Sequence, residues 1–302
     1  MICYPTPKIN IGLNVLCKRP DGYHDIETLF YPVAAFSDEL EIVRADGLPE
    51  GSPFAAGKPV RDGFSITIEG ADWDPQDDLT AKAWRLLAAE YGIGPVRIRM
   101  RKGIPVGAGL GGGSSDCACS LKMMSEIFGL GLSVERLEQL AGRLGADCAF
   151  FVRGIPQWGS GIGDILSPAS LDLSAYDIRL ALPSGVHVST AEAYAGLTPR
   201  DKWPSAQIPD TAFHDAPSGQ ISDSSPSHTP SFGLRKPCQD ISLHDAISLP
   251  VEQWRDLVVN DFEKSVFPRH PEIATLKAQM YADGALYASM TGSGSAVFGI
   301  FR

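Results

Sequence analysis

The residues with the clearest chemical meaning form a glycine-rich stretch, PVGAGLGGGSS, at positions 105–115. Glycine carries no Cβ, so the backbone N–H groups of such a stretch can converge on one anion. A helix predicted from about Ser114 adds its positive end, and the hydroxyls of Ser114 and Ser115 can cap that helix, donate to phosphate or reach Mg²⁺. Five glycines within seven positions disfavour an unliganded turn. The stretch therefore predicts a phosphate-binding loop.

The same glycines also satisfy the dinucleotide pattern GxGxxG, through Gly107, Gly109 and Gly112. A dinucleotide-binding unit needs a second strand after the helix, with an acidic residue roughly 20 residues further on. The apolar spacing of residues 134–144 indicates a second helix in that place instead. No GK[ST] closes the loop, and the kinase signatures HRD and DFG do not occur in the sequence. A Rossmann oxidoreductase remains an alternative that NAD binding would reveal.

Residues 8–16, KINIGLNVL, alternate polar and apolar side chains with the period of a strand. The alternation predicts one core-facing set and one opposite set: Ile9, Ile11, Leu13 and Val15 on the core side, and Lys8, Asn10 and Asn14 on the other. A lone lysine on a strand is usually a solvated surface residue. Lys8 therefore gains a chemical meaning only if an anionic partner lies beside it.

Asp147 is the candidate for such a partner and for accepting a proton. It follows a helix stop at Gly145 and precedes the apolar run 148–152. A carboxylate at that junction either caps the next turn or faces a cleft, and position alone favours capping. Tyr23 and His24 follow a predicted tight turn at residues 21–22, where packing at a turn and ligand binding both stay open.

Periodicity and cap residues outline the elements that must position these groups. They predict strands at 8–16, 26–35, 39–44, 64–69, 96–100, 177–183 and 285–290, with a last strand after a glycine turn at 291–295. They predict helices at 79–91 with Asp78 as N-cap, from about 114, at 134–144 with Ser133 as N-cap, at 189–196 and at 271–283. The glycine-rich residues 159–163 are predicted to be structural.

Composition narrows the class of partner. Lys and Arg total 26 against 36 Asp and Glu, and this net charge of −10 disfavours nucleic acid and favours a small molecule. No signal peptide and no spanning apolar run are visible, so no membrane contact and a cytoplasmic location are expected. Six cysteines without metal-ligand spacing predict reduced, mostly buried thiols. The polar residues 199–250 predict a disordered surface insertion.

Four blocks of the sequence resemble the GHMP kinases, named for galactokinase, homoserine kinase, mevalonate kinase and phosphomevalonate kinase. The blocks are PTPKINIGLNVLCKRPDGYHDIETLF, PVGAGLGGGSS, LGADCAFFVRG and MTGSGSAVFGIF, in that order along the chain. The glycine loop is shared by the whole superfamily. Lys8 with Asn10 and the DGYH sequence at 21–24 are more specific, and resemble the family of 4-diphosphocytidyl-2-C-methyl-D-erythritol kinases.

This resemblance implies an α/β fold of two lobes. An N-terminal ATP-binding lobe of mixed sheet and helices would span residues 1–160, and a smaller C-terminal α/β lobe would span 161–302, with the active site in the cleft. The implied reaction is ATP-dependent phosphorylation of the 2-hydroxyl of diphosphocytidyl-methylerythritol, giving the 2-phosphate and ADP in isoprenoid precursor synthesis. One departure concerns the adenine pocket, where the family usually has Asn and this chain has Asp78.

The resemblance also implies roles for individual residues. Asp147 would accept the hydroxyl proton, and Lys8 would keep that carboxylate ionised and offset charge on the transferred group. ATP would contact Lys102, Pro105, Val106, Gly107, Ala108, Gly109, Leu110, Gly111, Gly112, Gly113, Ser114 and Ser115. The acceptor substrate would contact Asn10, Tyr23, His24, Thr190 and Tyr194. Mg²⁺ would arrive with ATP, held by phosphates and by Ser114 or Ser115.

Two further alternatives stay open at this stage. A sibling kinase for homoserine or mevalonate would keep the glycine loop but has no use for the block at 21–24. A non-catalytic nucleotide-binding relic would commonly lose the base or the lysine, and the sequence retains both Asp147 and Lys8.

Overall fold

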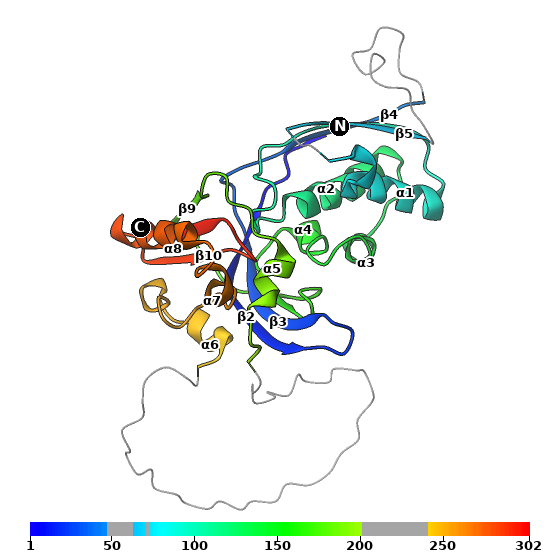
Figure 1. The fold of residues 1–302 in the computed structure, drawn as a ribbon. Coiled ribbons are helices and arrows are strands. Elements are labelled where there is room, and N and C mark those ends of the chain that lie inside the picture. The colour runs from blue at the N-terminus through cyan, green and yellow to red at the C-terminus, as the bar shows by residue number, and fades with distance from the viewer. Residues whose placement is uncertain (47–62, 71–72, 201–240) are drawn as a thin grey trace, which may run out of the picture.

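The computed structural model describes residues 1–46, 63–70, 73–200 and 241–302 (Figure 1). The strands are β1 (Ile2–Cys3), β2 (Lys8–Lys18), β3 (His24–Pro32), β4 (Glu39–Arg44), β5 (Phe64–Glu69), β6 (Val96–Arg101), β7 (Gln157–Ser160), β8 (Ile165–Pro168), β9 (Asp177–Ala181), β10 (Tyr287–Met290) and β11 (Val297–Phe301). The helices are α1 (Leu79–Tyr91), α2 (Gly112–Ile127), α3 (Val134–Gly142), α4 (Phe150–Arg153), α5 (Thr190–Ala195), α6 (Leu243–Ile247), α7 (Glu263–Val266) and α8 (Pro271–Ala282), with 3₁₀ turns at Pro75–Asp77 and Val251–Gln253.

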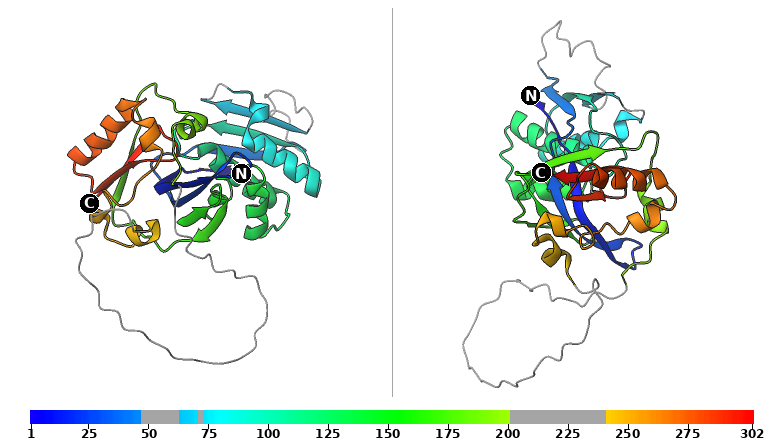
Figure 2. Two further views of the ribbon diagram at one scale, coloured as in Figure 1. Left: turned by 60° about the horizontal axis from the view of Figure 1, so that its bottom comes forward. Right: turned by 90° about the vertical axis from the view of Figure 1, so that its left-hand side faces the viewer.

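Among the described residues the strands form three sheets, ordered β1-β4-β6-β5, β2-β3-β7-β8 and β10-β11-β9. The first sheet is covered on one face by α1 and α2, and the third carries α8 (Figures 1 and 2). The long hairpin of β2 and β3 runs between these two units. The central hairpin therefore touches both halves of the molecule, and it carries Lys8.

The first sheet and its helices form where local signals are strong. Val96, Ile98 and Met100 alternate inward on β6 and are buried against α1 and α2. The Asp78 side chain accepts from the Thr80 amide at the start of α1, and Gly92 ends that helix in the left-handed conformation. The predicted helix 79–91, its cap and its stop are confirmed, as are the strands at 39–44 and 64–69.

The faces predicted for β2 hold as far as Ile11 and are exchanged beyond it, although Leu13 and Val15 are buried in a hydrophobic cluster as predicted. Gly12 has a φ of +69° and lies in a β-bulge, because the pairing with β3 shifts register between Ile11 and Leu13. The extra residue reverses the faces of the strand. Leu13 consequently lines the cavity that Lys8 faces, whereas Asn14 accompanies Glu27, to which its side-chain amide donates.

The predicted insertion at 199–250 is too long at its C-terminal end. Residues 201–240 lie outside the described residues. Helix α6 begins at Leu243 within the predicted insertion, is capped by the Ser242 hydroxyl, and buries Leu243, Ala246 and Ile247. The sequence did not predict this helix, because it lies next to a polar segment and its three apolar side chains span little more than one helical turn.

The predicted division of the chain at 160/161 passes through the hairpin of β7 and β8, which pair antiparallel in one sheet. This hairpin and the four-residue helix α4 are short elements that periodicity did not reveal. Residues 159–163 form the end of β7 and the start of its turn toward β8, and Ile162 of this segment lines a cavity. Within the described residues, every helix is too short or too polar to cross a membrane.

Candidate active site

The glycine loop joins β6 to α2, and three of its glycines adopt conformations that other residues avoid. Gly107, Gly109 and Gly111 have φ values of +67°, +76° and +72°. A Cβ on Gly109 would overlap the carbonyl oxygen of Thr291, and one on Gly111 would lie 3.3 Å from Cε of Lys8. The loop thus fits closely against both halves of the protein only because these positions lack side chains.

Helix α2 begins at Gly112, two residues before the predicted start. Its N-cap is Gly111, and no described side chain caps it. The first amides of α2 therefore point without a side-chain partner toward the space in front of the loop, which suits an incoming anion.

Two cavities meet at this loop. The larger has a volume of about 840 Å³ and the smaller about 470 Å³, and Gly107, Gly109 and Gly111 line both. The larger one brings together ten predicted site residues: Lys8, Asn10, Tyr23, His24, Gly107, Gly109, Gly111, Asp147, Thr190 and Tyr194. The smaller one is lined by Lys102, by Asp78 and by the loop from Pro105 to Ser114. A ligand in each cavity would meet the other at the glycines.

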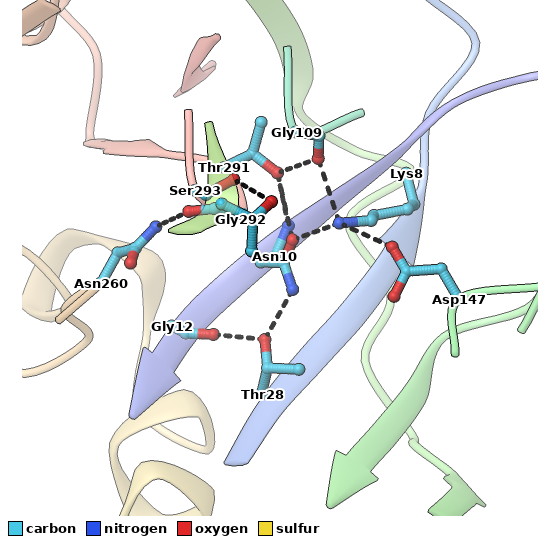
Figure 3. Close-up of polar contacts among 11 residues, drawn as sticks. Lys8, Asn10, Gly12, Thr28, Gly109, Asp147, Asn260, Thr291, Gly292 and Ser293 are labelled. Carbon is cyan, nitrogen blue, oxygen red and sulfur yellow. Dashed lines mark hydrogen bonds and ion pairs between the residues drawn. The ribbon is translucent and has the colours of Figure 1, made fainter. Parts of the chain in front are cut away.

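Lys8 and Asp147 form an ion pair on the wall of the larger cavity (Figure 3). Lys8 Nζ lies 3.5 Å from Asp147 Oδ2, and the lysine side chain is only 4% exposed. The ammonium also donates to Asn10 Oδ1 at 2.5 Å and to the Gly109 carbonyl at 3.0 Å. Asp147 lines the cavity, and within the described residues its carboxylate accepts no backbone amide and caps no turn, so the capping interpretation is wrong.

Asn10 holds Lys8 through a chain of hydrogen bonds. Its Oδ1 accepts from Lys8, and its Nδ2 donates to the Thr28 hydroxyl, which in turn donates to the Gly12 carbonyl (Figure 3). One of the two N–H donors of the Asn10 side chain is thus used within the protein. The arrangement favours Asn10 as a residue that positions the lysine.

The edge of β2 that does not pair with β3 is hydrogen-bonded to several separate segments. The Lys8 amide donates to Leu110 of the glycine loop, and the Asn10 amide donates to the Thr291 hydroxyl. Leu13 donates to the Val259 carbonyl and accepts from the Asp261 amide. One strand therefore sets the relative positions of the lysine, the loop and the C-terminal glycine turn.

Aromatic residues also line the larger cavity. The rings of His24 and Tyr194 stack with centroids 4.5 Å apart, and Tyr194 meets Phe262 edge to face. Burial lowers the pKa of the His24 imidazole and raises the pKa of the Tyr194 hydroxyl. Tyr23 is 61% exposed at the rim, and the Thr190 hydroxyl lies 3.3 Å from the Ser293 hydroxyl.

Lys102 lines the smaller cavity, but its ammonium is held by two carboxylates. It pairs with Asp38, and its Nζ lies 2.6 Å from Asp116 Oδ2, with the three side chains at most 5% exposed. Asp38 also accepts from the amides of Gly103 and Ile104 at the entry to the loop. Burial raises the pKa of the Asp116 carboxyl well above its usual range. The cluster joins the entry of the loop to α2.

The two predicted serines have different surroundings. Ser114 lines the smaller cavity. Ser115 is 3% exposed and its hydroxyl donates to the Thr6 carbonyl, which places it outside both cavities.

Several lining residues were missed by sequence reasoning. Leu13 enters the cavity through the bulge, which the glycine inside the strand pattern could have signalled. Ser293 lies in the glycine turn at 291–295, whose chemistry also fits a plain hairpin. His187 lies against Gly107, and no motif surrounds it.

Known proteins are similar to this chain in both sequence and fold. The family models "GHMP kinases N terminal domain" and "GHMP kinases C terminal" match residues 78–155 and 246–302. A curated 4-diphosphocytidyl-2-C-methyl-D-erythritol kinase of Bacteroides thetaiotaomicron is 43% identical over 302 residues, covering 100% of this chain and 92% of that protein. A relative of the same name from Cytophaga hutchinsonii is 40% identical, covering 100% and 93%.

Solved structures of related kinases have the same fold as this chain. A crystal structure of 4-(cytidine 5'-diphospho)-2C-methyl-D-erythritol kinase matches with a TM-score of 0.70 and 27% identity, over 99% of this chain and 90% of that one. A Methanococcus jannaschii mevalonate kinase, at 11% identity and a TM-score of 0.60 over 100% of this chain and 90% of that one, shares the fold alone. The predicted α/β fold is confirmed, and the chain belongs to the 4-diphosphocytidyl-2-C-methyl-D-erythritol kinase family of the GHMP kinases.

Proposed function

We propose that this protein is a small-molecule kinase that transfers the γ-phosphoryl group of ATP to the 2-hydroxyl of 4-diphosphocytidyl-2-C-methyl-D-erythritol. The observation that carries the proposal is the Lys8–Asp147 pair, 3.5 Å apart on the wall of one cavity and beside the glycines shared with a second cavity. Two substrates bound in the two cavities would meet beside an ammonium and a carboxylate. Phosphoryl transfer needs this combination of alignment and charge.

ATP fits the smaller cavity. The unpartnered amides of the loop and of the first turn of α2 would hold the triphosphate. The Asp78 carboxylate accepts from the Thr80 amide with Oδ1 and from the Trp73 indole with Oδ2. Asp78 thereby fixes the start of α1 and the indole beside the cavity, so it supports the base site even though the family usually has Asn there.

The acceptor substrate fits the larger cavity. Its cytosine base would lie against the aromatic wall of Tyr23, His24 and Tyr194, and Thr190 would contact its polar groups. The erythritol end would then extend toward Lys8 and Asp147. The larger cavity thus combines an aromatic wall with the Lys8–Asp147 pair, which favours an acceptor that carries both a base and an alcohol.

Asp147, Lys8 and Asn10 have different roles in the phosphoryl transfer. Asp147 accepts the proton of the 2-hydroxyl while the hydroxyl oxygen bonds to the γ-phosphorus of ATP. The bond from that phosphorus to the bridging oxygen breaks, and ADP leaves. The Lys8 ammonium, 3.5 Å from the Asp147 carboxylate, offsets negative charge on the transferred group. Asn10 holds the ammonium in place, because its Oδ1 accepts from Lys8 at 2.5 Å.

The serines fit a magnesium ion unequally. Ser115 uses its hydroxyl on Thr6, whereas Ser114 lines the nucleotide cavity and would hold Mg²⁺ together with ATP phosphates. The ion would neutralise phosphate charge. This division favours Ser114 of the two predicted ligands.

A coupled ADP-release assay tests the proposal. The purified protein would receive ATP and Mg²⁺ with 4-diphosphocytidyl-2-C-methyl-D-erythritol, homoserine or mevalonate in parallel, and ³¹P NMR would locate the new phosphate. We expect ADP release with the first acceptor only, and a monophosphate at its 2-position. Turnover with homoserine or mevalonate instead would make the protein a sibling kinase, and ATP binding without any turnover would make it a relic.

A further inference from the structure

His187 lies in the loop between β9 and α5 and contacts the backbone of the glycine loop from the other half of the molecule. A Cβ on Gly107 would lie 2.7 Å from His187 Nδ1 and would overlap Cε1, so the imidazole rests directly on this glycine. The side chain also lines the larger cavity, together with Lys8 and Asp147.

Gly107 lies where the two cavities meet, which suggests a role for its contact with His187. Gly107 lines both cavities, so His187 stands at the junction through which the phosphate chain of a bound nucleotide would approach the acceptor. His187 is exposed, and within residues 1–46, 63–70, 73–200 and 241–302 its ring nitrogens make no hydrogen bond. The neighbouring Val186 carbonyl accepts from the Ser295 hydroxyl, which anchors the loop beside the histidine.

The lysines that line the two cavities are already paired with carboxylates. Lys8 and Lys102 are the described lysines and arginines that line the two cavities, and each already pairs with carboxylate: Lys8 with Asp147, and Lys102 with Asp38 and Asp116. The proposed substrates carry a triphosphate and a diphosphate. An imidazole N–H aimed into the junction would add a hydrogen-bond donor that is not already paired with a carboxylate.

We propose that His187 is a phosphate-binding residue, whose ring N–H donates to a phosphate oxygen at the junction of the two cavities. The inference rests on the proposed function only for the source of the phosphate, either the triphosphate of ATP or the diphosphate of the acceptor. Both sources present the same oxygens, and binding measurements with separate probes distinguish them.

The experiment compares His187→Leu, which keeps an apolar contact on Gly107 without a donor, with His187→Gln, which keeps a donor. Calorimetry would measure binding of the β,γ-imido analogue of ATP, of CDP, and of adenosine and cytidine. We expect His187→Leu to weaken one of the phosphate-bearing probes about tenfold, as loss of one hydrogen bond to a charged group does. Binding of the nucleosides should stay unchanged, and His187→Gln should recover most of the affinity.

The control variant is His244→Gln, which removes a histidine that stacks on Trp158 outside both cavities. It should bind every probe like the wild type. The inference is overturned if His187→Leu binds both phosphate-bearing probes normally, or if it loses nucleoside affinity equally, because His187 would then only pack. Failure of the proposed function is distinguishable: a wild type that does not bind CDP would contradict the acceptor, while the ATP-analogue arm would still report on His187.

Discussion

Replacing Lys8 by Met removes the ammonium while keeping the length of a buried side chain. In the wild type, Lys8 Nζ lies 3.5 Å from Asp147 Oδ2. Two unit charges at this distance attract by about 5 kcal/mol at an effective dielectric constant of about 20. The Asp147 side chain is 34% exposed, and solvent screening reduces that attraction to roughly 3 kcal/mol. Because the Lys8 ammonium lies beside the proton-accepting carboxylate and offsets the negative charge on the transferred phosphoryl group, kcat should fall about 100-fold or more without it.

The same variant should change the KM for ATP by less than about threefold, because Lys8 does not line the nucleotide cavity. Steady-state kinetics with the ADP-release assay would measure both constants, and a thermal melt would check the fold. The double variant Lys8→Met/Asp147→Asn should lose no more than the worse single variant, since residues that act as a unit are not additive. A Lys8→Met enzyme that retains a tenth of the wild-type kcat would refute the reasoning.

Three other changes test separate parts of the structure. Asp147→Asn should lower kcat by about 10²- to 10⁴-fold and lower the melting temperature only modestly, because it removes the partner of the buried Lys8 ammonium but no helix cap among the described residues; kinetics and a melt would check both. Burial raises the pKa of the Asp116 carboxyl, so the native wild type loses stability as pH rises from the usual carboxyl range toward that raised pKa, whereas Asp116→Asn has no group to titrate there. The free energy of unfolding of the variant relative to the wild type, measured in urea titrations, should therefore increase with pH over this range; a decrease would contradict this sign. Gly109→Ala should lower the melting temperature more than Gly129→Ala and abolish turnover, because both glycines have positive φ but only the first Cβ would overlap backbone, at Thr291; equal melting temperatures would contradict it.

Local signals made much of the fold predictable. Helix α1 begins and ends where its N-cap and stop predicted, because Asp78 and Gly92 act on groups within four residues of themselves. The bulge at Gly12 could not be placed from alternation, since a bulge depends on the register of the partner strand. Elements of four or five residues, such as α6 and the strands β7 and β8, offer too few positions for a period to show.

The candidate site was predictable where it follows motifs. The structure brings Lys8, Asp147 and the glycine loop to one wall, although their catalytic roles stay predictions. The surroundings of Lys102 were not predictable, because its partner Asp38 is 64 residues away in the chain. His187 shows the same limit: contact with Gly107 arises from tertiary packing, which leaves no pattern in the sequence.

The bonding along the edge of β2 has a consequence for how substrates enter. Leu110, Thr291, Val259 and Asp261 all attach to this edge, and through it to the residue that carries the ammonium. Rotating one half of the molecule away from the other would break these bonds together, so a hinge that opens the floor of the cleft is costly. Admission of a base or a triphosphate must instead rely on small rearrangements at the rim, where Tyr23 lies exposed.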